Sequence, residues 1–305
     1  MPESKEQTLP ALWSEELLKS TLRGFRQEID GALESILPPE SQRPRKLHQA
    51  MRYSVFSGGK RLRSILVLGA CELCGGKRAE ALPTACAVEL VHTYSLIHDD
   101  LPALDDDDLR RGKPSSHKAF GEATAILTGD ALLTLAFEII SRENPSELAG
   151  PLALELARAA GSEGMIAGQA MDMEPEGKEN MDLLRYIHSH KTGSLIAVSV
   201  RMGAITARAP QKLLKKLSNY GQNLGLAFQI TDDLLDVEGK AAKLGKPVRQ
   251  DQEHGKLTYP SVLGLERSRT EAEKLIAKAV AELSSFGESS GFLQALARSI
   301  LKRQY

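Results

Sequence analysis

The sequence contains little cysteine and no long apolar segment. Only three of its 305 residues are cysteine, too few for the disulfide framework of a small secreted protein. No run of 18 apolar residues is present, so we expect no transmembrane helix and no stable membrane insertion. The polar start, Met1 to Glu6, lacks the apolar core of a signal peptide. We therefore expect a reduced, cytoplasmic protein.

Two of the cysteines, Cys71 and Cys74, form a CxxC motif that would suit a redox pair or a metal ion. They lie three residues apart in an apolar stretch with helical spacing, and the chain has no second pair to complete a zinc site. We interpret both as residues of a core helix.

Neither sign of charge is in excess. The chain has 39 basic and 40 acidic residues and a net charge of −1, so it lacks the basic surplus typical of nucleic-acid-binding proteins. The charges are instead gathered in short segments, and those segments carry the functional signal.

Strand-type alternation of polar and apolar residues is also missing, and so are low-complexity segments. Apolar residues recur at spacings of three and four, which is typical of helices. The predicted helices cover residues 11–37, 43–57, 60–74, 79–101, 121–142, 146–172, 180–204, 210–238, 258–284 and 290–303. No change of composition marks a boundary, so we predict one all-α domain over residues 1–305, a bundle of about ten or more helices. The longest loop, 239–257, is polar, and loops of that length are often functional.

One aspartate-rich group, FQITDDLLD, lies at residues 228–236. Gln229, Asp232 and Asp236 are spaced i, i+3 and i+7 and so share one face of the predicted helix. They could form an exposed acidic face, but their flanks are apolar, and burying carboxylates without a partner costs several kcal/mol. A bound cation is the favoured explanation.

A similar group, SLIHDDLPALDDDD, lies at residues 95–108. Asp99 and Asp105 would lie on different faces of a continuous helix. Pro102 disfavours helix at the preceding residue, so the helix is predicted to end or bend there and bring Asp105 back towards Asp99. His92 shares the face of Asp99, either as a structural histidine or as a partner for an anion.

Basic residues gather around these groups. GGKRLR at residues 58–63 places Lys60 and Arg63 at the start of a predicted helix, where free N–H groups attract anions. Arg110 and Arg111 follow the aspartates. These two arginines could serve only to neutralise the charge of the aspartates. Further basic candidates are Lys191, Lys246 and Lys256.

Carboxylates, a hard cation and basic side chains in one cavity suit diphosphate groups. Oxygen-only ligands favour Mg²⁺. One diphosphate would bridge the metal ions between the two aspartate groups, and the other would be held directly by basic residues. The sequence thus predicts a reaction between two diphosphate substrates.

Taken as a set, the motifs resemble the trans-prenyl diphosphate synthase family, most closely its bacterial farnesyl diphosphate synthases. The resemblance runs from about Leu33 to the C-terminus. The motifs that carry it are GGKRLR at 58–63, HTYSLIHDDLPALDDDDLRRGKPSSH at 92–117, GQAMD at 168–172, HKTG at 190–193, FQITDDLLD at 228–236, LGK at 244–246 and HGKLTYP at 254–260. Ser64 departs from the family, which usually has proline there; this should affect the helix start rather than the chemistry.

The resemblance assigns roles to individual residues. It implies metal ligands at Asp99, Asp105 and Asp232, supported by Asp100, Asp172 and Asp236. It implies an isopentenyl diphosphate site formed by Lys60, Arg63, His92 and Arg111. It implies an allylic diphosphate site formed by Arg110, Lys191, Thr192, Gln229, Lys246 and Lys256. The catalytic residues would be Asp99, Asp105, Arg110, Lys191, Thr192 and Asp232.

The family fold is a bundle of long helices around a deep cavity, usually as a homodimer, and its reaction uses about three Mg²⁺ ions, with Mn²⁺ as an alternative. The ions and basic side chains would stabilise charge on the departing diphosphate. The allylic C–O bond ionises, the isopentenyl double bond attacks the cation, and a proton leaves to the released diphosphate. A dry cavity would protect the cation from water.

Product length in this family depends on the floor of the cavity. The residue five positions before the first aspartate is Tyr94, followed by Ser95, and the insertion Leu101-Pro102 accompanies it. This combination resembles farnesyl synthases, whereas geranylgeranyl synthases usually lack the aromatic. The resemblance thus implies (2E,6E)-farnesyl diphosphate, made from isopentenyl diphosphate with dimethylallyl and then geranyl diphosphate.

Three other functions use parts of the same pattern. A geranylgeranyl or longer-chain synthase would share the motifs but not the aromatic floor. A terpene cyclase needs only one diphosphate site, so GGKRLR and His92 would be unexplained. A non-catalytic subunit of a heteromeric synthase commonly loses aspartates from one group, and both groups are complete here.

Overall fold

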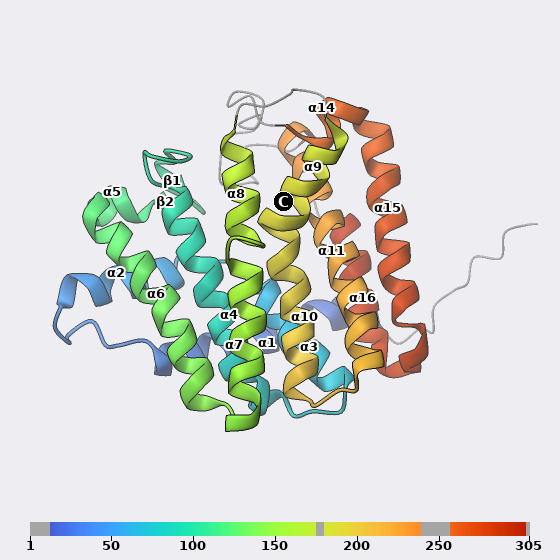
Figure 1. Ribbon diagram of the computed structural model, residues 1–305, viewed down its shortest axis with the longest axis horizontal. Helices are drawn as coiled ribbons and strands as arrows, with labels where there is room; N and C mark the ends of the chain where they lie inside the picture. The colour runs from blue at the N-terminus through green and yellow to red at the C-terminus, as the bar shows by residue number, and fades with distance from the viewer. Residues whose placement is uncertain (1–12, 175–179, 239–256, 303–305) are drawn as a thin grey trace, which may run out of the picture.

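The computed structural model describes residues 13–174, 180–238 and 257–302, and most of these residues are helical (Figure 1). The all-α prediction is confirmed. The predicted site residues Lys246 and Lys256, and residues 239–256 of the predicted long loop, lie outside the described part of the chain.

The helices follow one another with short connections. The first half of the chain forms α1 (Glu15–Ile36), α2 (Arg45–Val55), α3 (Leu62–Leu73), α4 (Arg78–Asp99), α5 (Ser116–Phe120), α6 (Glu122–Glu143) and α7 (Ser146–Ala160). The second half forms α8 (Met165–Met173), α9 (Met181–His188), the π-helical turn η1 (Ser189–Gly193), α10 (Ser194–Thr206), α11 (Gln211–Glu238), α14 (Tyr259–Leu263), α15 (Leu265–Glu282), the 3₁₀ segment η2 (Ser284–Ser290) and α16 (Gly291–Leu301).

The centre of the bundle is built from α3, α4 and α10. α10 packs against α3 and α11, α4 packs against α3 and α6, and α11 packs against α15. α3 is buried continuously from Ser64 to Cys71, as expected for a helix that is apolar on every face. One hydrophobic cluster extends from Leu18 in α1 to Ile300 in α16, so the described helices share a core. Cys71 is in that core and Cys74 at its edge, and both are free thiols.

Two predicted helices are interrupted, which corrects the sequence prediction. The helix predicted over 146–172 breaks between α7 and α8, where Gly161 and Gly164 adopt non-helical backbone angles. The helix predicted over 258–284 breaks at Gly264, whose φ of 77° lies in the region that glycine adopts without a steric penalty. A break of one turn leaves the apolar spacing on either side intact, so periodicity does not reveal it.

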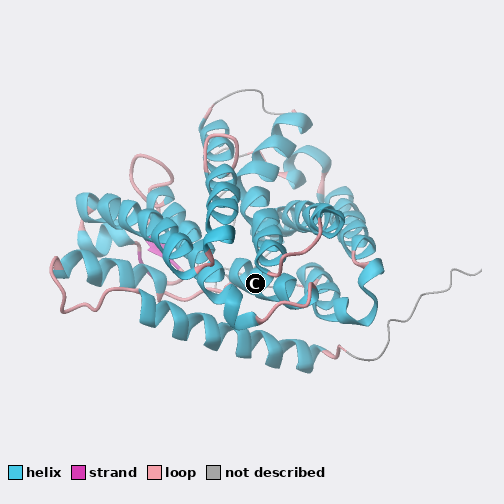
Figure 2. Cartoon of the chain, turned by 60° about the horizontal axis from the view of Figure 1, so that its bottom comes forward, coloured by secondary structure: helices cyan, strands magenta, loops and turns pink. Residues whose placement is uncertain are grey.

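A small β-hairpin also departs from the strand-free prediction (Figure 2). β1 (Leu109–Arg110) pairs antiparallel with β2 (Lys113–Pro114). The turn residues Arg111 and Gly112 have φ values of 55° and 76°, the positive angles that tight two-residue hairpins favour. Strands of two residues are too short to produce a detectable alternation.

Within the described residues, α6 is the one helix long and apolar enough to cross a membrane by length and composition. A core helix passes the same test. α6 packs against α2, α4 and α7, and we interpret it as a core helix with one open face.

Candidate active site

Residues from both aspartate groups and from the basic motifs meet around a cavity of about 340 Å³. The cavity is lined by Arg63, His92, Leu96, Asp107, Leu109, Arg110, Arg111, Thr192, Phe228, Gln229 and Asp232. Seven of these are predicted site residues: Arg63, His92, Arg110, Arg111, Thr192, Gln229 and Asp232. Segments that are far apart in the sequence thus form one site.

A larger cavity of about 470 Å³ lies between α1 and α16, at Trp13, Leu18 and Ala295. None of the predicted site residues that the structure describes lines it. Size alone does not locate the chemistry, and the smaller cavity, where the titratable groups converge, is the candidate active site.

Asp99 is the last residue of α4, and the chain turns back just beyond it. The Asp105 N–H donates to the Asp99 carbonyl at 2.8 Å, with Pro102 in the turn. Burial raises the pKa of the Asp99 carboxyl to about 6; Lys191 opposes this shift and Asp105 adds to it. A desolvated carboxyl beside another carboxyl is a group that a bound cation would stabilise.

Asp100 has different surroundings from Asp99. Its buried carboxylate accepts a hydrogen bond from Arg110 Nε at 2.8 Å and another from Arg110 Nη2. The same guanidinium lies 3.1 Å from Asp107 Oδ2. Arg110 therefore neutralises two carboxylates of the aspartate group while it also lines the cavity.

The three aspartates of α11 have different surroundings. Asp232 lines the cavity. Asp233 is buried and accepts hydrogen bonds from Gln229 Nε2 at 3.0 Å and from the Tyr259 N–H at 2.9 Å, so it ties α11 to α14. Asp236 is buried, and within the described structure its Oδ1 has no hydrogen-bond partner.

Two predicted residues lie on the π-helical turn η1, a distortion that often marks functional sites. Lys191 Nζ contacts Asp172 Oδ2 at 2.6 Å, and Thr192 Oγ1 donates to Gln229 Oε1 at 2.6 Å. α8 approaches η1 very closely: a Cβ at Gly168 would lie 2.1 Å from the Lys191 backbone nitrogen. Glycine is therefore required where α8 supports Lys191.

The GGKRLR segment is held by a buried ion network that its motif does not reveal. Arg61 contacts Glu89 Oε1 at 3.0 Å and Asp30 Oδ1 at 2.8 Å and donates to the Val55 carbonyl at 2.7 Å. Ser64, the departure from the family pattern, lies with its Oγ 2.8 Å from Glu89 Oε2. The hydroxyl thus extends this network, and Arg61 shapes the turn between Lys60 and Arg63.

The φ of 127° at Gly59 is one that favours glycine, and Arg111 lies against this residue. The Arg111 guanidinium donates to the Gly58 carbonyl, and a Cβ at Gly59 would lie 2.6 Å from Arg111 Nη1. The two basic motifs predicted for one diphosphate therefore lie in contact. Lys60 is exposed on the same segment.

Arg63 and His92 form a pair at the cavity. Arg63 Nη1 lies 3.1 Å from His92 Nε2, and since arginine can only donate, His92 Nε2 is the acceptor. Burial, followed by the nearby Arg63, holds the pKa of His92 well below its usual range. Arg63 Nε is buried and finds no partner within the described structure. The pair therefore has a donor available for an anion.

The two predicted chain-length residues lie on α4 but not on the cavity wall itself. Tyr94 is buried and contacts His98 edge-on, with ring centroids 5.8 Å apart. Burial raises the pKa of Tyr94 to about 12. The Ser95 hydroxyl donates to the His92 carbonyl.

Beyond the predicted set, the structure adds Asp107 and Phe228 to the cavity wall and Asp233 as a support. It also adds Gln169, whose side-chain amide is buried with both polar atoms unpartnered within the described structure. Gln169 belongs to the GQAMD motif, so the sequence contained a signal for it. Asp233 also lies in a motif, FQITDDLLD, but the motif does not show that the partner of Asp233 is the Tyr259 N–H, which is distant along the chain.

Comparison with known proteins agrees with this geometry. The polyprenyl synthetase family model matches residues 44–291. The farnesyl diphosphate synthase of Geobacillus stearothermophilus is 50% identical over 79% of this chain and 84% of that protein. The large subunit 1 of a heterodimeric geranylgeranyl pyrophosphate synthase of Arabidopsis thaliana is 46% identical over 90% of this chain and 76% of that protein.

A crystal structure of an FPP/GFPP synthase from Zymomonas mobilis superposes with a TM-score of 0.83 at 40% identity, over 93% of this chain and 98% of that chain. The match of the family model covers most of the chain, and the relatives match it over most of their own length. The chain therefore belongs to the polyprenyl synthetase family.

Proposed function

We propose that this trans-prenyl diphosphate synthase makes (2E,6E)-farnesyl diphosphate, acting as a dimethylallyltranstransferase and geranyltranstransferase. It would condense isopentenyl diphosphate with dimethylallyl diphosphate and then with geranyl diphosphate. The observation that carries the proposal is the single cavity at which residues of both aspartate groups and of the basic motifs converge.

We assign isopentenyl diphosphate to the basic side of the cavity. Lys60, Arg63, His92 and Arg111 are the proposed contacts. Among the described residues the buried Arg63 Nε has no acceptor, and this supports the assignment. A buried donor without an acceptor costs about 1–3 kcal/mol, and an anion would supply that acceptor. Neutral His92 keeps a proton on Nδ1 while Nε2 accepts from Arg63, and so orients the guanidinium.

We assign the allylic diphosphate to the side formed by η1 and α11. Arg110, Lys191, Thr192 and Gln229 are the proposed contacts, and the same role is proposed for Lys246 and Lys256. The Asp172 carboxylate holds Lys191, and Gln229 holds Thr192. These contacts orient the side chains before substrate binds, which lowers the cost of organising the site.

The carboxylates suit a divalent metal ion, which the family uses. Asp99, Asp105 and Asp232 are the proposed ligands, with Asp100, Asp172 and Asp236 in support. The raised pKa of Asp99 fits a nearby cation, and so does Asp236 Oδ1, which has no partner among the described residues. An all-oxygen set favours about three Mg²⁺ ions, with Mn²⁺ as the alternative. When bound, the metal would withdraw charge from the departing diphosphate.

The reaction follows from these positions. The allylic C–O bond breaks and its electrons stay on the diphosphate, which Arg110 and Lys191 help to hold. The isopentenyl double bond attacks the allylic cation and forms the new C–C bond. The proton then lost from the isopentenyl unit goes to the released diphosphate, so no protein nucleophile is needed.

Relatives are named both as farnesyl and as geranylgeranyl synthases, so similarity alone does not choose the product length. We therefore assign the C15 product from Tyr94 and Ser95. Tyr94→Ala should lengthen the product, and Tyr94→Phe, which keeps the ring, should not. Unchanged C15 output from Tyr94→Ala would show that Tyr94 does not limit the chain. A geranylgeranyl synthase is the alternative product class.

We also propose that the chain forms a homodimer in the cytoplasm and folds as one domain over residues 1–305. α6 supports the dimer, because Ile126 and Leu127 on it are 45% and 59% exposed. The continuous hydrophobic cluster supports one domain. A non-catalytic role in a heteromer is disfavoured, because both aspartate groups are complete.

The test is a product assay by mass spectrometry. Purified protein receives isopentenyl diphosphate, dimethylallyl or geranyl diphosphate, and Mg²⁺, with an EDTA control. A metal-dependent C15 diphosphate supports the proposal. A C20 or longer product retains the reaction and rejects the product assignment, and no condensation points to a missing partner subunit or a cyclase.

A further inference from the structure

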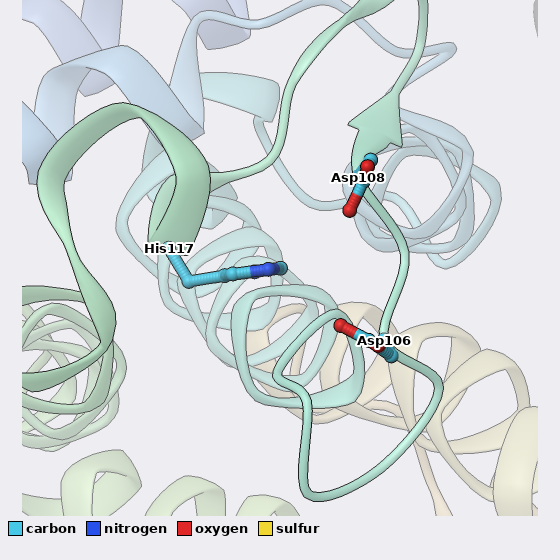
Figure 3. A group of neighbouring side chains, drawn as sticks. All are labelled: Asp106, Asp108 and His117. Carbon is cyan, nitrogen blue, oxygen red and sulfur yellow. The ribbon is translucent and has the colours of Figure 1, made fainter.

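Asp106, Asp108 and His117 form a group next to the candidate active site that the proposed reaction does not use (Figure 3). One ligand atom from each residue lies within 4.8 Å of the other two. We propose that this group binds a divalent transition-metal ion such as Zn²⁺, at a site separate from the proposed magnesium ligands. The inference does not depend on the proposed function.

His117 is the observation that distinguishes this group from an ordinary acidic surface. Its side chain belongs to α5 and only 5% of the residue is exposed. Within the described structure Nε2 has no hydrogen-bond partner, and Figure 3 shows the nitrogen-bearing edge of the ring directed towards the two carboxylates. A buried nitrogen without a partner is costly, and a metal ion between it and the carboxylates would remove that cost.

The other ring nitrogen is already in a suitable arrangement. His117 Nδ1 lies 3.0 Å from Ser115 Oγ. When Nδ1 carries the proton and donates to this hydroxyl, Nε2 keeps its lone pair for a metal. Histidine ligands in metal sites are commonly oriented by such a second contact.

The backbone around the group is held without any ion. The Ser115 N–H donates to the Asp108 carbonyl at 2.9 Å, which closes the hairpin loop and sets Asp108 beside the start of α5. Tyr53 Oη donates to the Pro114 carbonyl at 2.8 Å and fixes the loop to α2. The ligands are therefore brought together by contacts that exist in the free chain.

The donor set indicates which ion would bind. One imidazole nitrogen and two carboxylate oxygens suit Zn²⁺ or a similar transition metal, whereas Mg²⁺ prefers oxygen ligands alone. Three protein ligands leave further positions for water. The imidazole thus separates this site chemically from the proposed ligands Asp99, Asp105 and Asp232.

Lys118 competes for the same group. Its Nζ lies 2.8 Å from Asp108 Oδ1, and a metal ion would have to displace it or share the carboxylate with it. The lysine side chain is 43% exposed and can turn towards water. Lys118→Ala should therefore bind Zn²⁺ more tightly than the wild type.

The experiment is a calorimetric titration of Zn²⁺ into the full-length protein in saturating Mg²⁺, which occupies the oxygen-only sites. We expect one Zn²⁺ binding event per chain in the wild type. His117→Gln should weaken that event at least about tenfold, the scale on which the loss of even a supporting partner weakens a metal site. Asp99→Asn, which alters the proposed magnesium site, should leave the event unchanged.

The proposal is overturned by no Zn²⁺ event in the wild type, by an unchanged event in His117→Gln, or by loss of the event in Asp99→Asn. Because His117 is buried, circular dichroism must show that His117→Gln is folded. The double variant Asp106→Asn/Asp108→Asn alters only exposed side chains and should lose the event even if His117→Gln does not fold. Retention of the event in that double variant also rejects the site.

Discussion

At the scale of single residues, Asp99 and Asp233 illustrate two ways of burying a carboxylate. Asp233 accepts hydrogen bonds from Gln229 and from the Tyr259 N–H, so its charge is satisfied inside the chain. Asp99 lies beside Asp105 and its pKa is raised to about 6, so the fold holds it at a cost. Such a cost is expected where a carboxylate serves a ligand rather than the fold.

Replacing Asp99 should therefore separate activity from stability. We expect Asp99→Asn to lower kcat by at least about 10²-fold, as the loss of one charge-stabilising group typically does. In the absence of metal its melting temperature should equal or exceed that of the wild type, because a desolvated charge is removed. Steady-state kinetics and calorimetry measure the two effects, and Asp182→Asn on the exposed start of α9 is the matched control.

Replacing Asp233 should instead lower the stability of the fold. Asp233→Ala leaves the buried Tyr259 N–H without its acceptor, and we expect a loss of about 1–3 kcal/mol in the free energy of unfolding. A variant Asp233→Ala as stable as the wild type in urea would show that this contact does not support α14.

The raised pKa of Asp99 also predicts a pH dependence. In the metal-free protein a folded pKa of about 6, against the ordinary 3.8, means that the folded state binds this proton more tightly. The resulting stabilisation of the folded state is fully present below about pH 4 and is lost as the pH rises through about 6. Metal binding needs the ionised carboxylate, so it has the opposite trend.

We therefore expect Mg²⁺ to raise the melting temperature at pH 8 and to lose this effect as pH falls through about 6. Thermal denaturation with Mg²⁺ and with EDTA across this range measures the difference. In Asp99→Asn the Mg²⁺ effect should be small at every pH. An Mg²⁺ effect of constant size from pH 8 to 5 would contradict the role of Asp99.

At the scale of elements, the π-helical turn η1 determines where Lys191 and Thr192 lie. It joins α9 to α10, and the neighbouring α8 contacts it through Gly168. A regular α-helix over 180–204 would carry these side chains at different angles, because each turn of a π-helix holds more residues. The element that supplies two predicted catalytic residues is therefore the least regular helix near the site.

Gly168→Ala should disturb this arrangement. The added Cβ would meet the Lys191 backbone nitrogen at 2.1 Å, and neither helix backbone can move away without losing contacts. We expect a loss of about 1–3 kcal/mol in the free energy of unfolding together with a lower kcat, since Lys191 moves.

Gly150→Ala is the matched control, because a Cβ at this exposed position in α7 would meet nothing within 4 Å. It should be neutral or stabilise the protein by up to about 1 kcal/mol. Urea denaturation and kinetics on both variants make the comparison. Equal behaviour of the two alanine variants would show that the close approach of α8 to η1 is unimportant.

At the scale of the whole molecule, α6 carries large apolar side chains that are exposed. Ile126 and Leu127 lie on its outer side, although α6 packs against α4 within the bundle. Exposed apolar residues that lie side by side mark an interaction surface more often than isolated ones do. A second copy of the chain is the occupant that we propose.

Leu127→Lys should therefore weaken the dimer. We expect the mass measured by sedimentation equilibrium to fall from that of two chains to that of one, because a charge would be buried at the interface. Leu17→Lys on α1, where the native leucine is 44% exposed, should leave the mass unchanged. A wild-type mass of one chain would reject the homodimer.

The sequence alone determined the fold class and the two aspartate groups. Apolar spacing of three and four residues is a local property, and it predicts helices without any knowledge of their neighbours. The i, i+3 and i+7 spacing of Gln229, Asp232 and Asp236 likewise follows from one helix. Pro102 was sufficient to predict that the chain turns between Asp99 and Asp105. Roles for individual residues came from the resemblance to the family.

Only the tertiary structure decided which charged groups meet. Asp100 is bound to Arg110, Asp233 to the distant Tyr259 N–H, and His117 faces Asp106 and Asp108. The Asp233 contact joins segments that meet only when α14 packs on α11, and the other two pairings depend on the fold of the segment between α4 and α6. The burial that shifts the pKa of Asp99 arises from the packing of the helices. Local periodicity contains no information about such contacts, because it reports each side chain's direction from its own helix and not what lies opposite.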